Sequence, residues 1–196
     1  MRDAFLAVGI DAVSCDLLPT KRPGPHIQGD ALEQIGRRWA GVIAHPTCRY
    51  LTNAGVKHLY INGLKENGRY EPRWDDMRKG AEFFNAFKKS NAPCVAIENP
   101  VPHGWARALI GPQTQVVQPH YFGDPYFKGT AFWLIGLLPL VRTHYMTLPK
   151  AGTPEHKAWS YVHRLAPSED REELRSQTFP RLAQACAWQW GHGCIA

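Results

Sequence analysis

The chain has 196 residues, of which 44% are hydrophobic, and its formal net charge is +6. A length of this order suits one domain with a sizeable core, and the hydrophobic fraction excludes a disordered or fibrous chain. The positive charge favours an anionic partner, nucleic acid first, although Lys and Arg are scattered along the chain. We therefore expect a single domain spanning residues 1–196.

The cysteine content and the apolar runs bear on location. Five cysteines, an odd number without regular spacing, argue against a secreted disulfide framework and favour a reducing compartment. The N-terminal residues lack the apolar stretch of a signal peptide, and the most apolar run, residues 132–141, is too short to span a bilayer. We therefore expect a cytoplasmic protein with no membrane partner. Cys186, His192 and Cys194 have irregular spacing and no evident fourth ligand, so we expect no metal site.

The first part of the chain alternates short apolar segments with loops and amphipathic segments. In chain order these patterns predict a helix over residues 3–9, strands over residues 12–15 and 27–30, a helix over residues 31–38 and a strand over residues 39–44. Residues 18–26 are rich in Pro, Lys and Arg and are expected to form a loop.

The middle of the chain holds the clearest patterns. Residues 74–89 carry apolar side chains at helical spacing with charges between them, which predicts an amphipathic helix. Apolar runs over residues 94–97 and 131–135 predict buried strands. Strands that alternate with helices favour an α/β fold with a mostly parallel, doubly wound sheet, and ligands of such sheets bind beyond the carboxyl ends of the strands.

Several residues with useful chemistry follow directly after the expected strands. They are Asp16, Asp30, the segment His45-Pro46-Thr47-Cys48 and the segment Glu98-Asn99-Pro100. Because the carboxyl ends of parallel strands meet at one edge of a sheet, we expect these residues to share a rim.

Cys48 and Glu98 suggest chemistry on a pyrimidine ring. Carbon-5 of a pyrimidine resists methylation until a nucleophile adds to carbon-6, and a thiolate is both a strong nucleophile and a good leaving group. The addition is easier if a carboxyl group beside an amide holds the ring nitrogen and the exocyclic amine, and Glu98-Asn99 supplies both. His45 and Arg49, which flank Cys48, favour its thiolate form. A base within duplex DNA has to be flipped out to reach such a site.

The order of these motifs resembles that of the cytosine-5 DNA methyltransferases. The resemblance rests on Asp16, Gly29-Asp30, Pro46-Thr47-Cys48, Glu98-Asn99-Pro100 and the segment Phe122-Gly123-Asp124-Pro125-Tyr126-Phe127-Lys128. The stretches over residues 44–53 and 176–180 are similar to small phage- and prophage-borne methyltransferase-like proteins, and the likeness extends over nearly the whole chain. It implies a Rossmann-like class I methyltransferase fold with helices on both faces of the sheet, and S-adenosylmethionine as cofactor.

The resemblance also implies roles for individual residues. Cys48 takes the place of the family's nucleophile and Glu98, followed by Asn99, that of the acid that holds the base. Asp16 and Asp30 stand where the family contacts the ribose and the adenine of S-adenosylmethionine, with Pro46 beside them. A further catalytic position falls on Lys128, which replaces an arginine of the element that supports the catalytic loop.

Three departures from the family pattern are visible. Thr47 and Pro100 replace a proline and a valine, and Tyr126 and Thr130 depart from the element that contains Lys128. The family's first strand and glycine loop have no counterpart, which leaves three explanations: a start codon placed too late, replacement of the strand by a second copy or a partner chain, or a degenerate protein that has lost catalysis. Residues 140–164 leave no room for a separate target-recognition domain.

Three functions therefore stay open. The first is S-adenosylmethionine-dependent cytosine-5 methylation of DNA, and the second is an inactive relative that binds nucleic acid or a protein partner. The third is methylation of a free pyrimidine nucleotide, which would need a phosphate clamp such as Arg49 or Lys128. Structural roles compete at each position: a buried thiol for Cys48, turn formation for Asp16 and Asp30, and a solvated charge for Lys128.

Overall fold

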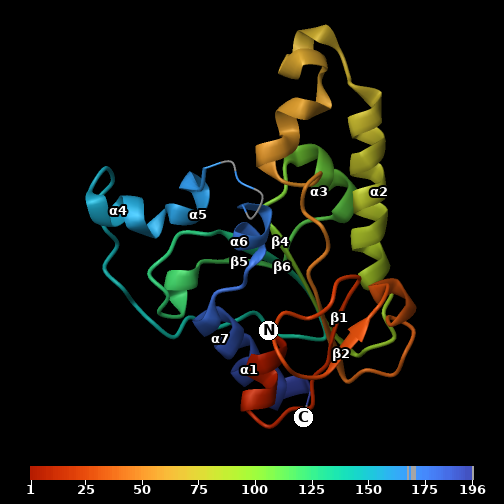
Figure 1. The fold of residues 1–196 in the computed structure, drawn as a ribbon, viewed down its shortest axis with the longest axis vertical. Coiled ribbons are helices and arrows are strands. Elements are labelled where there is room, and N and C mark those ends of the chain that lie inside the picture. Colours follow the sequence, from red (N-terminus) through yellow and green to blue (C-terminus); the bar gives the residue numbers. More distant parts are fainter. Residues whose placement is uncertain (167, 169–170, 196) are drawn as a thin grey trace. The chain divides into compact units, whose positions relative to one another are not determined.

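The computed structural model of this chain describes residues 1–166, 168 and 171–195 and has an α/β fold (Figure 1). The residues gather into two compact units. Unit 1 contains residues 1–29, 117–129 and the described residues from 138 onward, and unit 2 contains residues 30–116 and 130–137.

Unit 2 is built on a sheet with the strand order β3-β4-β6-β5. The bounds of these strands are Gly41–Ala44 for β3, Cys94–Pro100 for β4, Thr130–Ile135 for β6 and Gln115–Val117 for β5. Strands β3 and β4 are parallel, with Ala44 opposite Ile97, whereas β4 and β6 are antiparallel, with Glu98 opposite Phe132. All but the last residue of β4 are buried, as expected for a central strand.

This mixed sheet contradicts the expected doubly wound, Rossmann-like parallel sheet. Strand β6 runs against β4, and the other sheet of the molecule has two strands. The physical reason is that an apolar strand is buried and forms backbone hydrogen bonds with its neighbour in either direction. The apolar pattern of residues 131–135 predicts a strand and carries no information about its direction.

The core of unit 2 lies between this sheet and helix α2 (Glu71–Phe87), with the shorter helix α3 (Gly104–Ile110) beside α2. Helix α2 buries its apolar side chains at helical spacing, among them Trp74, Met77 and Phe84. The ring of Phe84 meets that of Trp133 from β6 edge to face, with 4.8 Å between the ring centroids. The expected helix over residues 74–89 is therefore confirmed, shifted by a few residues.

The chain between β3 and α2 folds as three short 3₁₀ segments, η2 (Asn53–Leu59), η3 (Ile61–Gly63) and η4 (Lys65–Asn67). The indole Nε1 of Trp74 donates to the carbonyl oxygen of Leu59 at 2.8 Å, and Tyr60 pairs with Arg69 in an isolated β-bridge. These contacts hold the 3₁₀ segments against the amino-terminal end of α2.

Unit 1 contains a pair of parallel strands and most of the short helices. Strand β1 (Ser14–Asp16) pairs with β2 (His26–Gln28), and helix α1 (Arg2–Ala7) packs against α7 (Pro180–Trp190). The remaining helices are α4 (Pro154–Trp159), α5 (Tyr161–Arg164) and α6 (Arg171–Ser176), and a π-helical turn, η6 (Gly191–Ile195), follows α7.

Other expectations are partly corrected. Residues 31–38 form a 3₁₀ turn, η1 (Ala31–Glu33), instead of a helix, although Ala31, Leu32 and Ile35 pack against the core of unit 2. Cys94 is disulfide-bonded, whereas Cys15, Cys48 and Cys186 are thiols, so the cysteine count did not exclude a disulfide. Among the described residues, no helix has the length and hydropathy needed to cross a membrane.

Candidate functional site

The candidate site begins where β3 and β4 end side by side. Their parallel register pairs Ala44 with Ile97, so the next residues along the two strands, His45 and Glu98, are neighbours. The Nδ1 atom of His45 lies 2.6 Å from Oε2 of Glu98. The short distance requires one proton between the two groups, carried by the imidazole or by the carboxyl group.

Burial distinguishes the two partners of this pair. The side chain of Glu98 is 10% exposed, and that of His45 is 37% exposed. A carboxyl group taken out of water needs a polar partner, because burying it alone is costly. His45 supplies that partner and fixes one oxygen of the carboxyl group, which sets the orientation of the whole group.

Asn99 fixes the loop that follows β3. Successive side chains of a strand point to opposite faces, so Asn99 is directed away from the face that carries Glu98. Its Nδ2 donates to the backbone oxygen of Pro46 at 3.3 Å, and its side chain is buried, with 1% exposed. Asn99 thus holds the segment that leads from His45 to Cys48.

Cys48 lies on this loop as a partly buried thiol. Its carbonyl oxygen accepts a hydrogen bond from the backbone N–H of Leu51 at 3.0 Å, which closes a turn directly after the thiol. Leu51 is fully buried and anchors the turn to the core of unit 2. The structure therefore brings His45, Glu98 and Asn99 together and places Cys48 on a loop held at both ends.

His103 provides the second anchor of the loop. It is buried, and its Nδ1 accepts the backbone N–H of Ala106, which caps α3. Its Nε2 lies 3.2 Å from the carbonyl oxygen of Tyr50, so the neutral ring carries its proton on Nε2 and donates it there. Burial lowers the pKa of His103 below its ordinary value, which favours this neutral form.

The expected cofactor residues have local partners. Asp16, in unit 1, accepts the backbone N–H of Leu18 at 2.9 Å, and Asp30, in unit 2, accepts that of Leu32 at 2.8 Å. Both aspartates are exposed. This is the arrangement of an aspartate that forms a turn or caps a helix. Each carboxylate is therefore engaged in its own turn, and the S-adenosylmethionine site stays a prediction.

Lys128 lies in unit 1, near another motif of the family resemblance. Its Nζ donates to the carbonyl oxygen of Gln177 at 2.9 Å and lies 5.8 Å from the ring centroid of Phe179. In the same unit, the Oδ2 atom of Asp124 accepts the backbone N–H of Arg181 at 2.9 Å, in the first turn of α7. The segment 122–128 and the segment 176–180 therefore meet, as parts of one local structure.

The candidate metal ligands near the C-terminus are not brought together by what the structure describes. Cys186 is fully buried in α7, and the ring of His192 lies against Trp188 with 4.9 Å between centroids. The side chain of Cys194 lies outside the described residues. Across the described part of the chain, no group of three His, Cys, Asp or Glu residues could hold a metal ion.

No family model, curated protein or solved structure matches this chain. The resemblance to cytosine-5 methyltransferases therefore rests on the sequence motifs alone.

Sequence reasoning missed two roles in this site. His45 was expected to act on Cys48, but its Nδ1 contacts Glu98. His103 was not singled out at all, although a His three residues before a helical N–H can cap the helix that follows. The alternation of side-chain direction along β4 was a further signal, because it predicts that Glu98 and Asn99 point to opposite faces of the sheet.

Proposed function

We propose that unit 2 carries a site for a pyrimidine base, at which the thiol of Cys48 adds to the ring while Glu98 holds it, as in a cytosine-5 methyltransferase of DNA. The observation that carries this proposal is the buried carboxyl group of Glu98, oriented by His45 at 2.6 Å, beside the loop that bears Cys48. A carboxyl group in such surroundings is typical of functional sites.

The chemistry uses two groups of this chain. The sulfur of Cys48 forms a bond to carbon-6, the π electrons between carbon-5 and carbon-6 move to carbon-5, and the ring nitrogen takes a proton from the carboxyl group of Glu98. Carbon-5 then accepts an electrophile and loses its hydrogen as a proton. The bond between sulfur and carbon-6 breaks, and the ring nitrogen returns its proton to Glu98. In a methyltransferase the electrophile is the methyl group of S-adenosylmethionine.

His45 and Asn99 support this chemistry without touching the base. A hydrogen bond to one carboxyl oxygen of Glu98 leaves the group with a defined direction, which matters because small misplacements of a reacting group reduce rates strongly. The bond from Asn99 to Pro46 limits the positions of the loop in the same way. Both are positioning residues for the groups that react.

A second candidate function is favoured by a different observation. Asp16 and Asp30 are bonded into their own turns, so the residues expected to bind the cofactor have structural roles. This favours a relative that keeps the base site and binds nucleic acid without transferring a methyl group. A second copy or a partner chain that completes the cofactor site would reconcile the two candidates.

Hydrogen exchange at carbon-5 tests the proposal without a methyl donor. Reversible addition of a thiol to carbon-6 replaces the hydrogen on carbon-5 by deuterium from heavy water, which mass spectrometry of the digested nucleosides detects. We expect exchange in cytosine of single-stranded or duplex DNA and none with Cys48→Ala. Cys15→Ala is the matched control, because Cys15 is also a partly buried thiol and should be dispensable.

The choice of substrate separates the candidates. Exchange in DNA but not in deoxycytidylate supports a DNA-modifying enzyme, and the reverse result supports a nucleotide-modifying one. If wild-type protein exchanges no hydrogen in duplex DNA, single-stranded DNA or deoxycytidylate, thiol addition is not its function and the binding candidate takes its place.

A further inference from the structure

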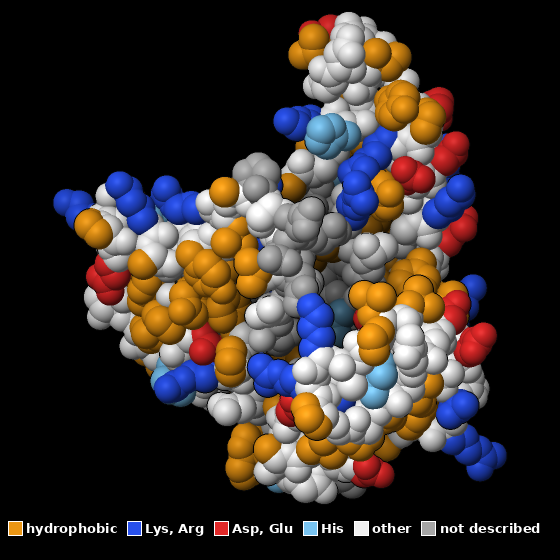
Figure 2. Space-filling view, in the orientation of Figure 1, with side chains coloured by type: hydrophobic (Ala, Val, Ile, Leu, Met, Phe, Trp, Pro, Cys, Tyr) orange, Lys and Arg blue, Asp and Glu red, His pale blue; other side chains and the backbone are white. Residues whose placement is uncertain are grey.

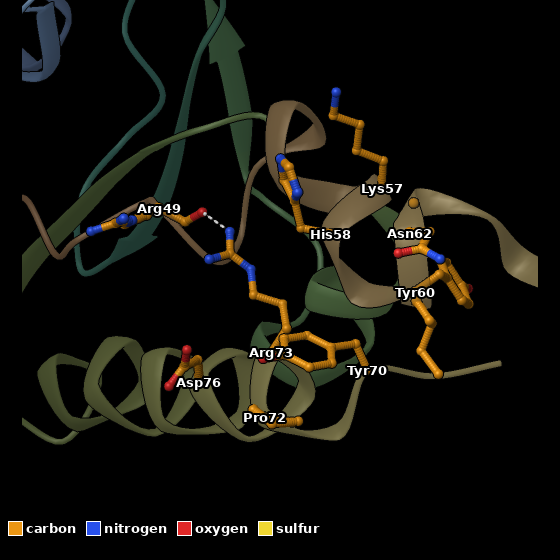
Figure 3. Close-up of a pocket in the computed structure, with 11 residues that line it drawn as sticks. Arg49, Lys57, His58, Tyr60, Asn62, Tyr70, Pro72, Arg73 and Asp76 are labelled. Atoms are coloured by element: carbon orange, nitrogen blue, oxygen red, sulfur yellow. Dashed lines mark hydrogen bonds between the residues drawn. The ribbon is translucent and has the colours of Figure 1, made fainter. Parts of the chain in front are cut away.

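A basic cavity lies in unit 2, next along the chain from the thiol. It has a volume of about 830 Å³ and is formed by the loop after Cys48, the 3₁₀ segments η2 and η3 and the first turns of α2 (Figure 3). Arg49, the residue after Cys48, belongs to its lining. A ligand bound here would therefore be close to the loop that carries the proposed nucleophile.

The charges around this cavity are mostly positive. Arg49, Lys57 and Arg73 line it together with His58, and Asp76 is the one acidic lining residue. Within the part of the chain that the structure describes, none of the three cations is ion-paired with a carboxylate. Figure 2 shows Lys, Arg and His side chains near one another on the arm formed by α2 and the 3₁₀ segments, with acidic side chains along the outer edge of α2. The cavity is thus suited to an anion.

Arg73 is the best positioned of these cations. Its Nη2 donates to the carbonyl oxygen of Arg49 at 3.0 Å, shown as a dashed line in Figure 3, and its guanidinium carbon lies 4.3 Å from the ring centroid of Tyr50. A guanidinium group has five N–H donors, so further donors can bind oxygen atoms of a ligand. Stacking on a ring and bonding to a carbonyl reduce the entropy that Arg73 loses on binding.

Gly55 makes room for this arrangement. A Cβ atom at position 55 would lie 3.0 Å from Nη2 of Arg73 and 3.1 Å from the carbonyl oxygen of Arg49. Gly55 is buried, and its φ lies outside the left-handed region, so any residue could adopt this backbone conformation. The small residue at this position therefore serves the approach of Arg73 to the loop.

Tyrosine rings in the same lining identify the kind of anion. Tyr60 and Tyr70 line the cavity, and Tyr70 is 51% exposed. A basic groove with aromatic rings is the arrangement by which proteins bind single-stranded nucleic acid, because cations contact phosphates and rings stack on bases. The net charge of +6 is consistent with a polyanion.

We propose that this cavity binds the phosphodiester backbone of a DNA strand, with Arg73 as the principal phosphate ligand. The inference deepens the proposed function, on which the choice of DNA rests. Arg49 and Lys57 contribute further phosphate contacts, and the exposed ring of Tyr70 stacks on a base. The bound strand would carry its neighbouring nucleotide to the loop of Cys48.

A salt titration of DNA binding tests the inference. The full chain is mixed with a fluorescein-labelled, single-stranded oligodeoxynucleotide, and the affinity is measured by anisotropy at several salt concentrations. We expect Arg73→Gln to weaken binding roughly tenfold, since a hydrogen bond to a charged group is lost. The slope of log affinity against log salt should fall by about 0.7, the value for one phosphate contact on a single strand.

Three further variants sharpen this test. Arg78→Gln is the matched control, because Arg78 is an exposed arginine of the same helix that is paired with Asp75 and Glu71 and should not matter for binding. Gly55→Ala keeps every charge but displaces the guanidinium group, and should weaken binding as well. Lys57→Gln alters an exposed side chain and tests the cavity even if Arg73→Gln fails to fold, which circular dichroism would reveal.

The outcomes separate this inference from the proposed function. If Arg73→Gln, Gly55→Ala and Lys57→Gln all leave the affinity and the salt slope at wild-type values, the cavity does not bind DNA. If the variants weaken binding but wild-type protein exchanges no hydrogen at carbon-5, the cavity binds DNA and the proposed chemistry is wrong. Glu98→Gln should slow exchange by roughly 10²–10⁴-fold and leave the salt slope unchanged.

Discussion

Two pairs of parallel strands in this molecule carry an acidic residue near their ends, and the two residues have different surroundings. Asp16 ends β1 in unit 1, is exposed and accepts the N–H of Leu18, two residues further on. Glu98 lies near the end of β4 in unit 2, is buried and contacts His45, which follows the neighbouring strand. The first carboxylate shapes its own turn, and the second is held by a segment distant in the sequence.

The difference shows which observation identifies a site. An acidic residue near the end of a strand is common to both pairs, and so is a nearby thiol, Cys15 in β1 and Cys48 after β3. Burial of the carboxyl group and a side-chain partner from another strand are found for Glu98 and are absent from the surroundings of Asp16 that the structure describes. If this contrast has functional consequences, substitutions at the two acids should have unequal effects.

The largest expected effect separates the two acids directly. Glu98→Gln keeps the shape of the side chain but supplies no proton to the ring nitrogen, so hydrogen exchange at carbon-5 should slow by roughly 10²–10⁴-fold, the usual contribution of a positioned acid. Asp16→Asn should leave the rate within about twofold, since its carboxylate bonds to its own turn. Equal losses for both variants would contradict the contrast drawn here.

A second effect concerns the histidines of the two strand pairs. His45→Ala removes the hydrogen bond between Nδ1 and the buried carboxyl group of Glu98 and should lower the free energy of unfolding by about 1.5–3 kcal/mol, the value for a hydrogen bond to a charged group, measured by urea denaturation. In unit 1, His26 bonds to Ser14 and to the carbonyl oxygen of Leu18 on an exposed edge. His26→Ala should cost about 0.5–1.5 kcal/mol, the net value of an ordinary hydrogen bond.

A conservative variant at position 45 separates the effect of the hydrogen bond to Glu98 from the effect of side-chain size. His45→Gln can still donate a hydrogen bond to Glu98, so we expect it to recover part of the stability and part of the exchange rate that His45→Ala loses. Recovery of stability without any recovery of the exchange rate would show that the hydrogen bond to Glu98 does not position its carboxyl group for exchange.

Much of the fold of unit 2 follows from sequence patterns. Helix α2 was expected because its apolar residues recur at helical spacing over several turns, and β4 because its apolar run is uninterrupted. The direction of β6 was not predictable, since an apolar run is the same when read in either direction. Gly136 follows that strand with φ of 66°, and a Cβ atom there would lie 2.1 Å from the carbonyl oxygen of Pro93, a close approach that the sequence does not reveal.

The site was predictable to the extent that chemistry depends on residue type. Cys48 and Glu98 were singled out because few residues can add to a pyrimidine or protonate it. The contact of His45 with Glu98 depends on the register of two strands, and the position of Arg73 depends on a glycine far away in the sequence. Such contacts arise from tertiary packing. The residues between β3 and α2 have no periodic sequence pattern from which their packing could be predicted.

The smallest effect is a pH dependence that arises at the loop of Cys48. Burial lowers the pKa of His103 below its ordinary value of 6.5, so the unfolded chain binds a proton there more readily than the folded chain. His103 therefore contributes stability that is present above pH 6.5 and is lost as the pH falls through the lower pKa of the folded state. His120 in unit 1 is shifted in the same direction and adds to the slope of the wild-type curve.

Two substitutions isolate the contribution of His103 to the pH dependence of stability. His103→Asn keeps an acceptor for the N–H of Ala106 at the start of α3 and removes the titration, so the urea midpoint should depend less on pH between pH 7 and pH 5. Stability at pH 7 should fall by about 0.5–1.5 kcal/mol, because the hydrogen bond to the carbonyl oxygen of Tyr50 is lost. His103→Ala also removes the cap and should cost about 1 kcal/mol more at pH 7. If His103→Asn retains the full pH dependence of wild-type protein, the titrating group lies elsewhere, and the loop of Cys48 is not sensitive to pH through its anchor.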